Sequence, residues 1–74
     1  MANEFTFEIT RMIGVISENT KTDWKREINL VSWNGGEPKF DIREWSPDHQ
    51  RMSRGITMSC DEARKVSELI SALL

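Results

Sequence analysis

The run Pro38-Lys39-Phe40-Asp41-Ile42-Arg43-Glu44-Trp45-Ser46 alternates between two kinds of side chain. Phe40 and Ile42 share one face, and the other face carries Lys39, Asp41, Arg43 and Trp45. Alternation with a period of two predicts a β-strand, because successive side chains of a strand point to opposite faces. The second face combines two cations with an indole, so it is either a solvated sheet surface or a binding surface.

A second alternating run lies just upstream, from Trp24 to Asn34. One of its faces carries Ile28 and Leu30, and the other carries Lys25, Glu27, Asn29, Val31 and Trp33. The residues Asn34-Gly35-Gly36 then tolerate the positive φ angles that a tight hairpin turn needs. Pro38 can open the next strand, where a missing N–H costs little. The two runs are therefore predicted to pair as a hairpin.

Further strands are predicted on both sides of this hairpin. Residues 5–17 begin with strand alternation, but the parity slips between Arg11 and Gly14, which predicts a bulge or bend at Gly14 or a break into two strands. Residues 18–23 have the composition of an exposed loop. A loop from Ser46 to Ser53 leads to a short fourth strand over residues 54–58.

The last segment has the pattern of an amphipathic helix. Ser59 and Glu62 have the spacing of a capping box. An apolar stripe follows at helical spacing and consists of Ala63, Val66, Leu69, Ile70 and Leu73. We expect this stripe to cover the apolar sheet face made by Ile28, Leu30, Phe40, Ile42, Ile56 and Met58. The predicted fold class is α+β, a four-stranded antiparallel sheet (ββββα) with one C-terminal helix on one face, in one domain over residues 1–74.

The composition of the chain and its single cysteine and histidine limit the classes of function that it can have. The net charge is only −2, so a nucleic-acid binder would need a local basic surface. Cys60 is the single cysteine, which excludes an intrachain disulfide and fits a reducing cytosol. Residues 1–10 lack the pattern of a signal peptide, and no apolar run reaches the roughly 20 residues that span a bilayer. His49 lies beside Asp48 in a loop without a candidate nucleophile, so we expect an exposed histidine and no enzymatic activity. One histidine and one cysteine supply too few ligands for a metal site, and we expect no cofactor.

The sheet face opposite the helix is the candidate site. It presents two indoles and three cations through Lys25, Asn29, Val31, Trp33, Lys39, Arg43 and Trp45. Bases of a single strand stack on aromatic rings for about 1–3 kcal/mol each, and cations follow the phosphates. Either tryptophan could instead lie in a dimer interface or stiffen the hairpin as a cross-strand pair. Glu27 and Asp41 share this face and either pair with Lys25 and Arg43 or line a groove edge.

Two runs resemble a known family: Phe40-Asp41-Ile42-Arg43-Glu44-Trp45, and Arg54-Gly55-Ile56-Thr57-Met58-Ser59 before a terminal helix. They are similar to the transcriptional positive cofactor four family. The similarity is greater to its short bacterial, YdbC-like members, over residues 31–34 and 45–49. The resemblance implies a curved sheet, a homodimer, and outer sheet faces that bind single-stranded DNA with little sequence preference. It implies DNA contacts for Arg43 and Arg54 and base stacking for Trp33, whereas Trp45 lies one position away from the family's aromatic residue.

The resulting hypothesis is a non-enzymatic, homodimeric, single-stranded-DNA-binding protein of the bacterial cytoplasm or nucleoid, acting in transcription, replication or repair. The expected contact residues are Lys25, Asn29, Trp33, Lys39, Arg43, Trp45 and Arg54. Two alternatives remain open at this point. One is single-stranded RNA as the ligand, and the other is a protein-interaction module that uses Trp33 and Trp45 as hot spots.

Overall fold

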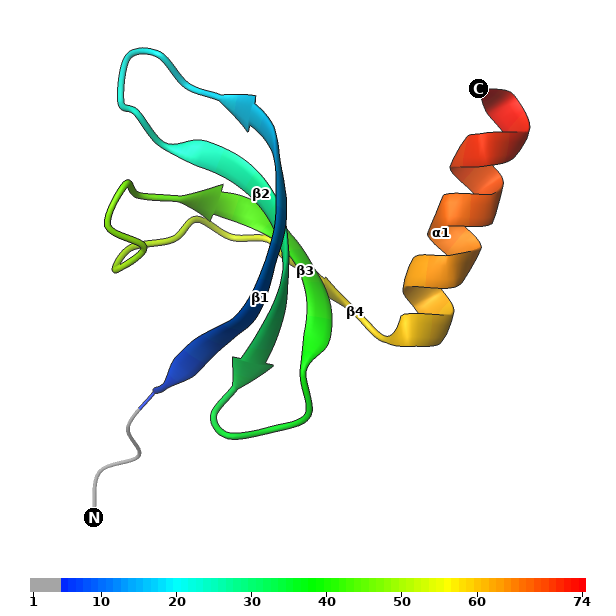
Figure 1. Cartoon of the computed structure of the whole chain (residues 1–74), viewed down its shortest axis with the longest axis horizontal. Coiled ribbons are helices and arrows are strands. Elements are labelled where there is room, and N and C mark those ends of the chain that lie inside the picture. Colours follow the sequence, from blue (N-terminus) through cyan, green and yellow to red (C-terminus); the bar gives the residue numbers. More distant parts are fainter. Residues whose placement is uncertain (1–4) are drawn as a thin grey trace.

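The computed structural model describes residues 5–74 (Figure 1). Four antiparallel strands form one sheet in the order β1-β2-β3-β4, and one helix follows. The elements are β1 (Phe7–Glu18), β2 (Lys25–Trp33), β3 (Lys39–Trp45), β4 (Ile56–Met58) and α1 (Cys60–Leu73). The predicted ββββα fold is confirmed. Residues 1–4, which belong to the predicted domain and to the segment expected not to be a signal peptide, lie outside the described part.

The hairpin of β2 and β3 has the predicted register. Asn29 pairs with Asp41, and the neighbouring pairs keep the two faces as the alternation predicts. Asn34 and Gly35 both have positive φ, 52° and 74°. Asn34 also joins the turn to the chain before β1, because its Oδ1 accepts a hydrogen bond from the backbone N–H of Thr6 at 2.9 Å.

Strand β1 is one continuous strand with three irregularities, so the alternative of two strands is wrong. Its register against β2 shifts between Ile9 and Arg11, between Met12 and Gly14, and between Val15 and Ser17. The second shift is the one predicted at Gly14. Each β-bulge adds a residue to one strand and increases the local twist and bend. Three such irregularities explain why β1 bends strongly along its length (Figure 1).

The sheet is curved, as the family resemblance implied, and it curls toward the face that was predicted to lie opposite the helix. Phe7 pairs with Trp33 at one end of β2, whereas Trp45 pairs with Lys25 at the other end. The Phe7 ring nevertheless lies 6.1 Å from the Trp33 ring and 5.3 Å from the Trp45 ring. Residues at both ends of the β2–β3 hairpin can approach the same ring of Phe7 only if the sheet is curled. We call this side the concave face; it comprises Lys25, Glu27, Asn29, Val31, Trp33, Lys39, Asp41, Arg43 and Trp45.

Helix α1 stands on the convex side, apart from most of the sheet (Figure 1). Its predicted capping box is confirmed, since the Ser59 side chain accepts from the Glu62 N–H and the Glu62 side chain accepts from the Ser59 N–H. Only Ser59 separates β4 from α1, which leaves little slack for the helix to fold back. No helix residue is buried, and Leu73 is 89% exposed. The expectation that the helical stripe covers the sheet is therefore wrong for the single chain.

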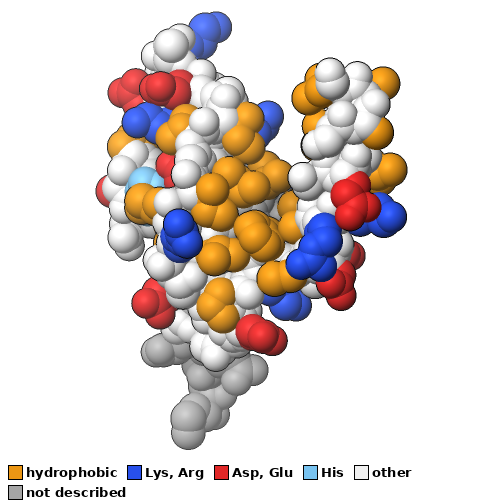
Figure 2. Space-filling view, turned by 45° about the vertical axis from the view of Figure 1, so that its right-hand side comes forward, with side chains coloured by type: hydrophobic (Ala, Val, Ile, Leu, Met, Phe, Trp, Pro, Cys, Tyr) orange, Lys and Arg blue, Asp and Glu red, His pale blue; other side chains and the backbone are white. Residues whose placement is uncertain are grey.

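An open groove of about 800 Å³ separates the helix from the convex face. Figure 2 shows hydrophobic side chains gathered on the sheet beside the helix, with a hollow between the two. The apolar groove lining includes Ile28, Phe40, Ile42, Met58, Ala63, Val66 and Ile70. Within residues 5–74, no helix is long and apolar enough to cross a membrane.

The most deeply buried residues lie on the concave face instead. Val31 and Trp45 are 0% and 1% exposed there, and Glu27, Asn29 and Asp41 are buried beside them. The single chain thus builds its small core inside the curl of the sheet.

Candidate nucleic-acid interface

The curl gathers aromatic rings from β1, β2 and β3 into one cluster. Phe7 lies between the two indoles, and the Phe5 ring lies 5.8 Å from that of Trp33. Phe5 is exposed, and Phe7 and Trp33 are half-buried. The accessible aromatic surface therefore belongs to Phe5, Phe7 and Trp33. The two phenylalanines were not among the expected contact residues, although their alternation and an antiparallel pairing of β1 with the end of β2 would have placed them beside Trp33.

Trp45 is enclosed, so its predicted exposure is wrong. The loop of residues 46–53 folds back over it and forms a bridge between Trp45 and Met52. The backbone N–H of Ser46 donates to the carbonyl of Arg51 at 3.0 Å, which closes the loop. The His49 ring lies 5.7 Å from the indole. Together with Phe7, these groups make Trp45 part of the core.

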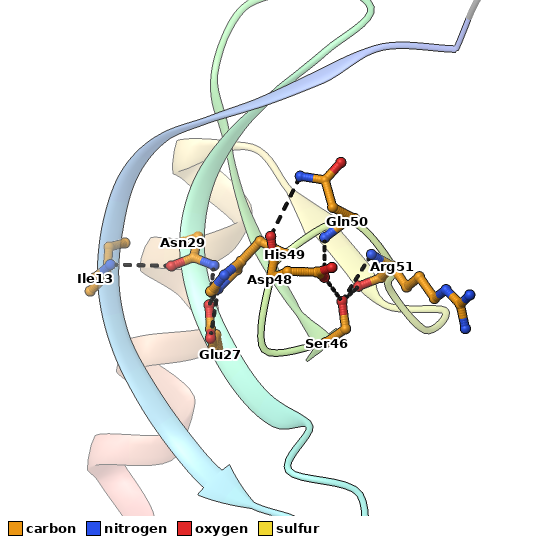
Figure 3. A network of polar contacts seen from close by, with 8 residues as sticks. All are labelled: Ile13, Glu27, Asn29, Ser46, Asp48, His49, Gln50 and Arg51. Carbon is orange, nitrogen blue, oxygen red and sulfur yellow. Dashed lines mark hydrogen bonds and ion pairs between the residues drawn. The ribbon is translucent and has the colours of Figure 1, made fainter.

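A chain of polar contacts ties the same loop to β1 across the concave face (Figure 3). The N–H of Ile13, at the second register shift, donates to Asn29 Oδ1 at 3.3 Å. Asn29 Nδ2 donates to Glu27 Oε1 at 3.0 Å, and His49 Nε2 lies 3.0 Å from Glu27 Oε2. Asn29 is thus only 1% exposed, and its side chain binds Ile13 and Glu27 within the protein, so it does not lie on the open sheet surface that the sequence predicted. His49 is half-buried and paired, and it, rather than Lys25, is the partner of Glu27.

Asp48 holds the turn that carries His49. Its Oδ1 accepts hydrogen bonds from the Ser46 hydroxyl at 2.7 Å and from the Gln50 N–H at 3.0 Å (Figure 3). The Gln50 N–H, followed by the Ser46 hydroxyl, lowers the pKa of the Asp48 carboxyl below its ordinary value of 3.8. His49 follows with a positive φ of 59°, which turns its ring back toward Glu27.

Arg43 pairs with Asp41, which is the first of the two alternatives predicted for Asp41, pairing with a cation or lining a groove edge. Arg43 Nε donates to Asp41 Oδ1 at 2.6 Å, and Nη2 donates to Oδ2 at 2.7 Å. The guanidinium also lies over the Trp33 indole, with Cζ 4.5 Å from the ring centroid. A third donor, Nη1, reaches the Ser53 carbonyl at 3.2 Å. Arg43 therefore connects β3, the indole on β2 and the loop before β4.

The remaining expected cations are Lys25, Lys39 and Arg54, and all three are exposed. Within residues 5–74, none of them forms an ion pair. They do not form one cluster, because Lys25 lies opposite Trp45 and Lys39 lies opposite Val31, toward the other end of the hairpin. Arg54 precedes Gly55, which packs so closely on β3 that a Cβ there would collide with the Arg43 Cβ and the Ile42 carbonyl.

The structure thus brings Trp33 and Arg43 together, buries Asn29 and Trp45, and leaves the expected cations Lys25, Lys39 and Arg54 exposed and without an ion pair to any residue from 5 to 74. Comparison with known proteins gives a match over residues 20–69 to the family described as Transcriptional Coactivator p15 (PC4). The chain is also similar to an uncharacterized protein of Treponema pallidum (strain Nichols). The two are 35% identical over 71 residues, which cover 96% of this chain and 82% of that protein. The match spans β2, β3, β4 and most of α1, and the chain belongs to the PC4 family of transcriptional coactivators.

Proposed function

We propose that this protein is a non-enzymatic binder of single-stranded DNA that acts as a homodimer in transcription. The observation that carries the proposal is the accessible aromatic surface of Phe5, Phe7 and Trp33 on a sheet that also exposes Lys25, Lys39 and Arg54. Membership of a transcriptional coactivator family supports a role in transcription. Replication and repair would use the same unpaired strands.

Stacking and charge each contribute to such binding. An aromatic ring contributes about 1–3 kcal/mol for each stacked base, and this contribution depends little on sequence because every base has a π-face. Three separate exposed cations suit a flexible strand, whose phosphates follow the protein surface. A duplex is a poorer ligand, since no basic helix is present in residues 5–74 to enter a major groove.

The homodimer is supported by the uncovered convex side. The apolar side chains of the helical stripe are exposed, and so is Ile56 on β4; the exposed stripe residues are Val66, Leu69, Ile70 and Leu73. Full burial of such side chains is worth about 1.5–3 kcal/mol each. A second copy offers a matching apolar helix for the groove between α1 and the sheet, and a chain of 74 residues gains burial in this way.

The function is tested by titrating oligo-dT into the protein while tryptophan fluorescence is recorded. We expect quenching that saturates and that high salt reverses, because phosphate contacts release counterions. Trp33→Phe should remove most of the quenching, whereas Trp24→Phe, a half-buried tryptophan before β2, is the matched control and should retain it.

Two results would decide against the proposal or redirect it. Wild-type protein that shows no quenching and no retention on an oligo-dT column at low salt is not a single-strand binder. Matched RNA and DNA oligomers distinguish the two ligands, and tighter binding of the RNA would overturn the assignment to DNA, because discrimination then rests on the 2′-hydroxyl.

A further inference from the structure

The guanidinium of Arg43 is almost fully engaged inside the protein. A guanidinium carries five N–H donors. In this structure Nε and Nη2 both reach Asp41, and Nη1 reaches the Ser53 carbonyl at 3.2 Å and the Met52 sulfur at 3.4 Å. The Arg43 side chain is only 13% exposed. Little of its hydrogen-bonding edge remains for a phosphate.

Asp41 is fixed even more firmly than its partner. Its side chain is fully buried, and Oδ2 accepts a further hydrogen bond from the Thr57 hydroxyl at 2.8 Å. A buried carboxylate needs a charged partner and hydrogen bonds, because its desolvation is otherwise very unfavourable. Because two hydrogen bonds join Arg43 to Asp41, the plane of the guanidinium is fixed in one orientation. That orientation places Cζ over the Trp33 ring.

We propose that Asp41 is a positioning residue, which holds Arg43 against Trp33 so that Arg43 supports the base-stacking indole and does not act as a phosphate contact. The proposal rests on the proposed function and names the roles of three residues within that site. An arginine can stack on an aromatic ring while its edge pairs with a carboxylate, whereas lysine cannot do both.

The two roles of Arg43 predict opposite effects for Asp41→Asn. If Arg43 contacts a phosphate, removing the neighbouring negative charge frees its charge and strengthens oligo-dT binding. If Arg43 supports Trp33, the same change loosens the guanidinium and weakens binding about fivefold, in the range of a lost cation–π contact. Glu37→Gln is the matched control, because it removes a negative charge at an exposed position of the hairpin loop. It should leave affinity unchanged or raise it slightly.

Arg43→Lys gives a second test that keeps the charge and avoids a buried substitution at Asp41. The positioning role predicts a loss of about fivefold, close to that of Arg43→Ala, together with a salt dependence of log Kd equal to that of wild type. A phosphate contact predicts that lysine retains most of the affinity and that alanine lowers the slope of this dependence by about 0.7.

Thermal unfolding of each variant in the absence of DNA shows whether it is folded. If Asp41→Asn does not fold, Arg43→Lys alone distinguishes the positioning role from a phosphate contact. Tighter binding by folded Asp41→Asn, or normal binding by Arg43→Lys, would overturn the positioning role while leaving single-strand binding intact. Absence of oligo-dT binding by the wild-type protein would instead overturn the function on which this proposal rests.

Discussion

At the scale of single residues, Gly55 shows how a small side chain shapes the site. A Cβ at this position would collide with the Arg43 Cβ and with the backbone carbonyl of Ile42, and neither the carbonyl nor the strand that carries it can move freely. We expect Gly55→Ala to lower the free energy of unfolding by about 1–3 kcal/mol, the usual cost of overpacking. Urea denaturation measures this change. Gly14→Ala is the control, because nothing lies within 4 Å of a Cβ there; equal effects of the two substitutions would contradict the close approach.

Features that depend on neighbouring residues could be predicted from the sequence, whereas contacts between distant residues could not. The hairpin turn at residues 34–36 and the capping box of Ser59 and Glu62 were predicted, because each depends on local chemistry within a few positions. The role of His49 was not predictable, since its partner Glu27 lies 22 positions away in the chain. The burial of Trp45 likewise depends on the path of a loop whose composition indicates only a turn.

At the scale of elements, β1 determines the curvature of the sheet. Alternation along the sequence predicted which side chains share a face, and it predicted the irregularity at Gly14. It could not predict that three irregularities act together, because the others lie where the spacing of apolar residues is ambiguous. The resemblance to a family with a curved sheet implied the curl, whereas the alternation alone suggested an open outer face.

The second register shift has its own anchor in Asn29. The amide satisfies the N–H of Ile13 and also donates to the buried carboxylate of Glu27. We expect Asn29→Leu to lower the free energy of unfolding by about 1–3 kcal/mol, because the Ile13 N–H then loses its partner and the buried Glu27 carboxylate keeps only its contact with His49. Amide hydrogen exchange should be fastest around Ile13 in this variant. A variant as stable as wild type would show that this chain of polar contacts does not contribute to the stability of the fold.

At the scale of the whole molecule, burial is distributed over the two sheet faces in the opposite way from what the sequence predicted. The concave face holds the small core, and the convex face with its helix is left open. The sequence pattern identified both apolar surfaces but not what covers each one, because coverage depends on the direction in which the helix leaves β4. The open side supports the proposed homodimer, which the family resemblance had implied.

If the protein is the proposed homodimer, we expect Ile70→Glu to make it monomeric, because this substitution places a charge in the apolar groove. Light scattering at micromolar concentration measures the mass. Lys65→Ala is the control, since Lys65 is exposed and does not line the groove, and it should leave the dimer intact. A wild-type protein with the mass of one chain would refute the dimer directly.

An NMR titration shows directly whether unpaired nucleotides bind to the aromatic surface of Phe5, Phe7 and Trp33. The protein has three tryptophans, and therefore three indole N–H signals can be followed while oligo-dT is added. We expect the Trp33 signal to shift most, the signal of the enclosed Trp45 to shift less, and the backbone signals of the helical stripe to stay in place. Unchanged indole signals, or shifts confined to α1, would contradict binding at the aromatic surface.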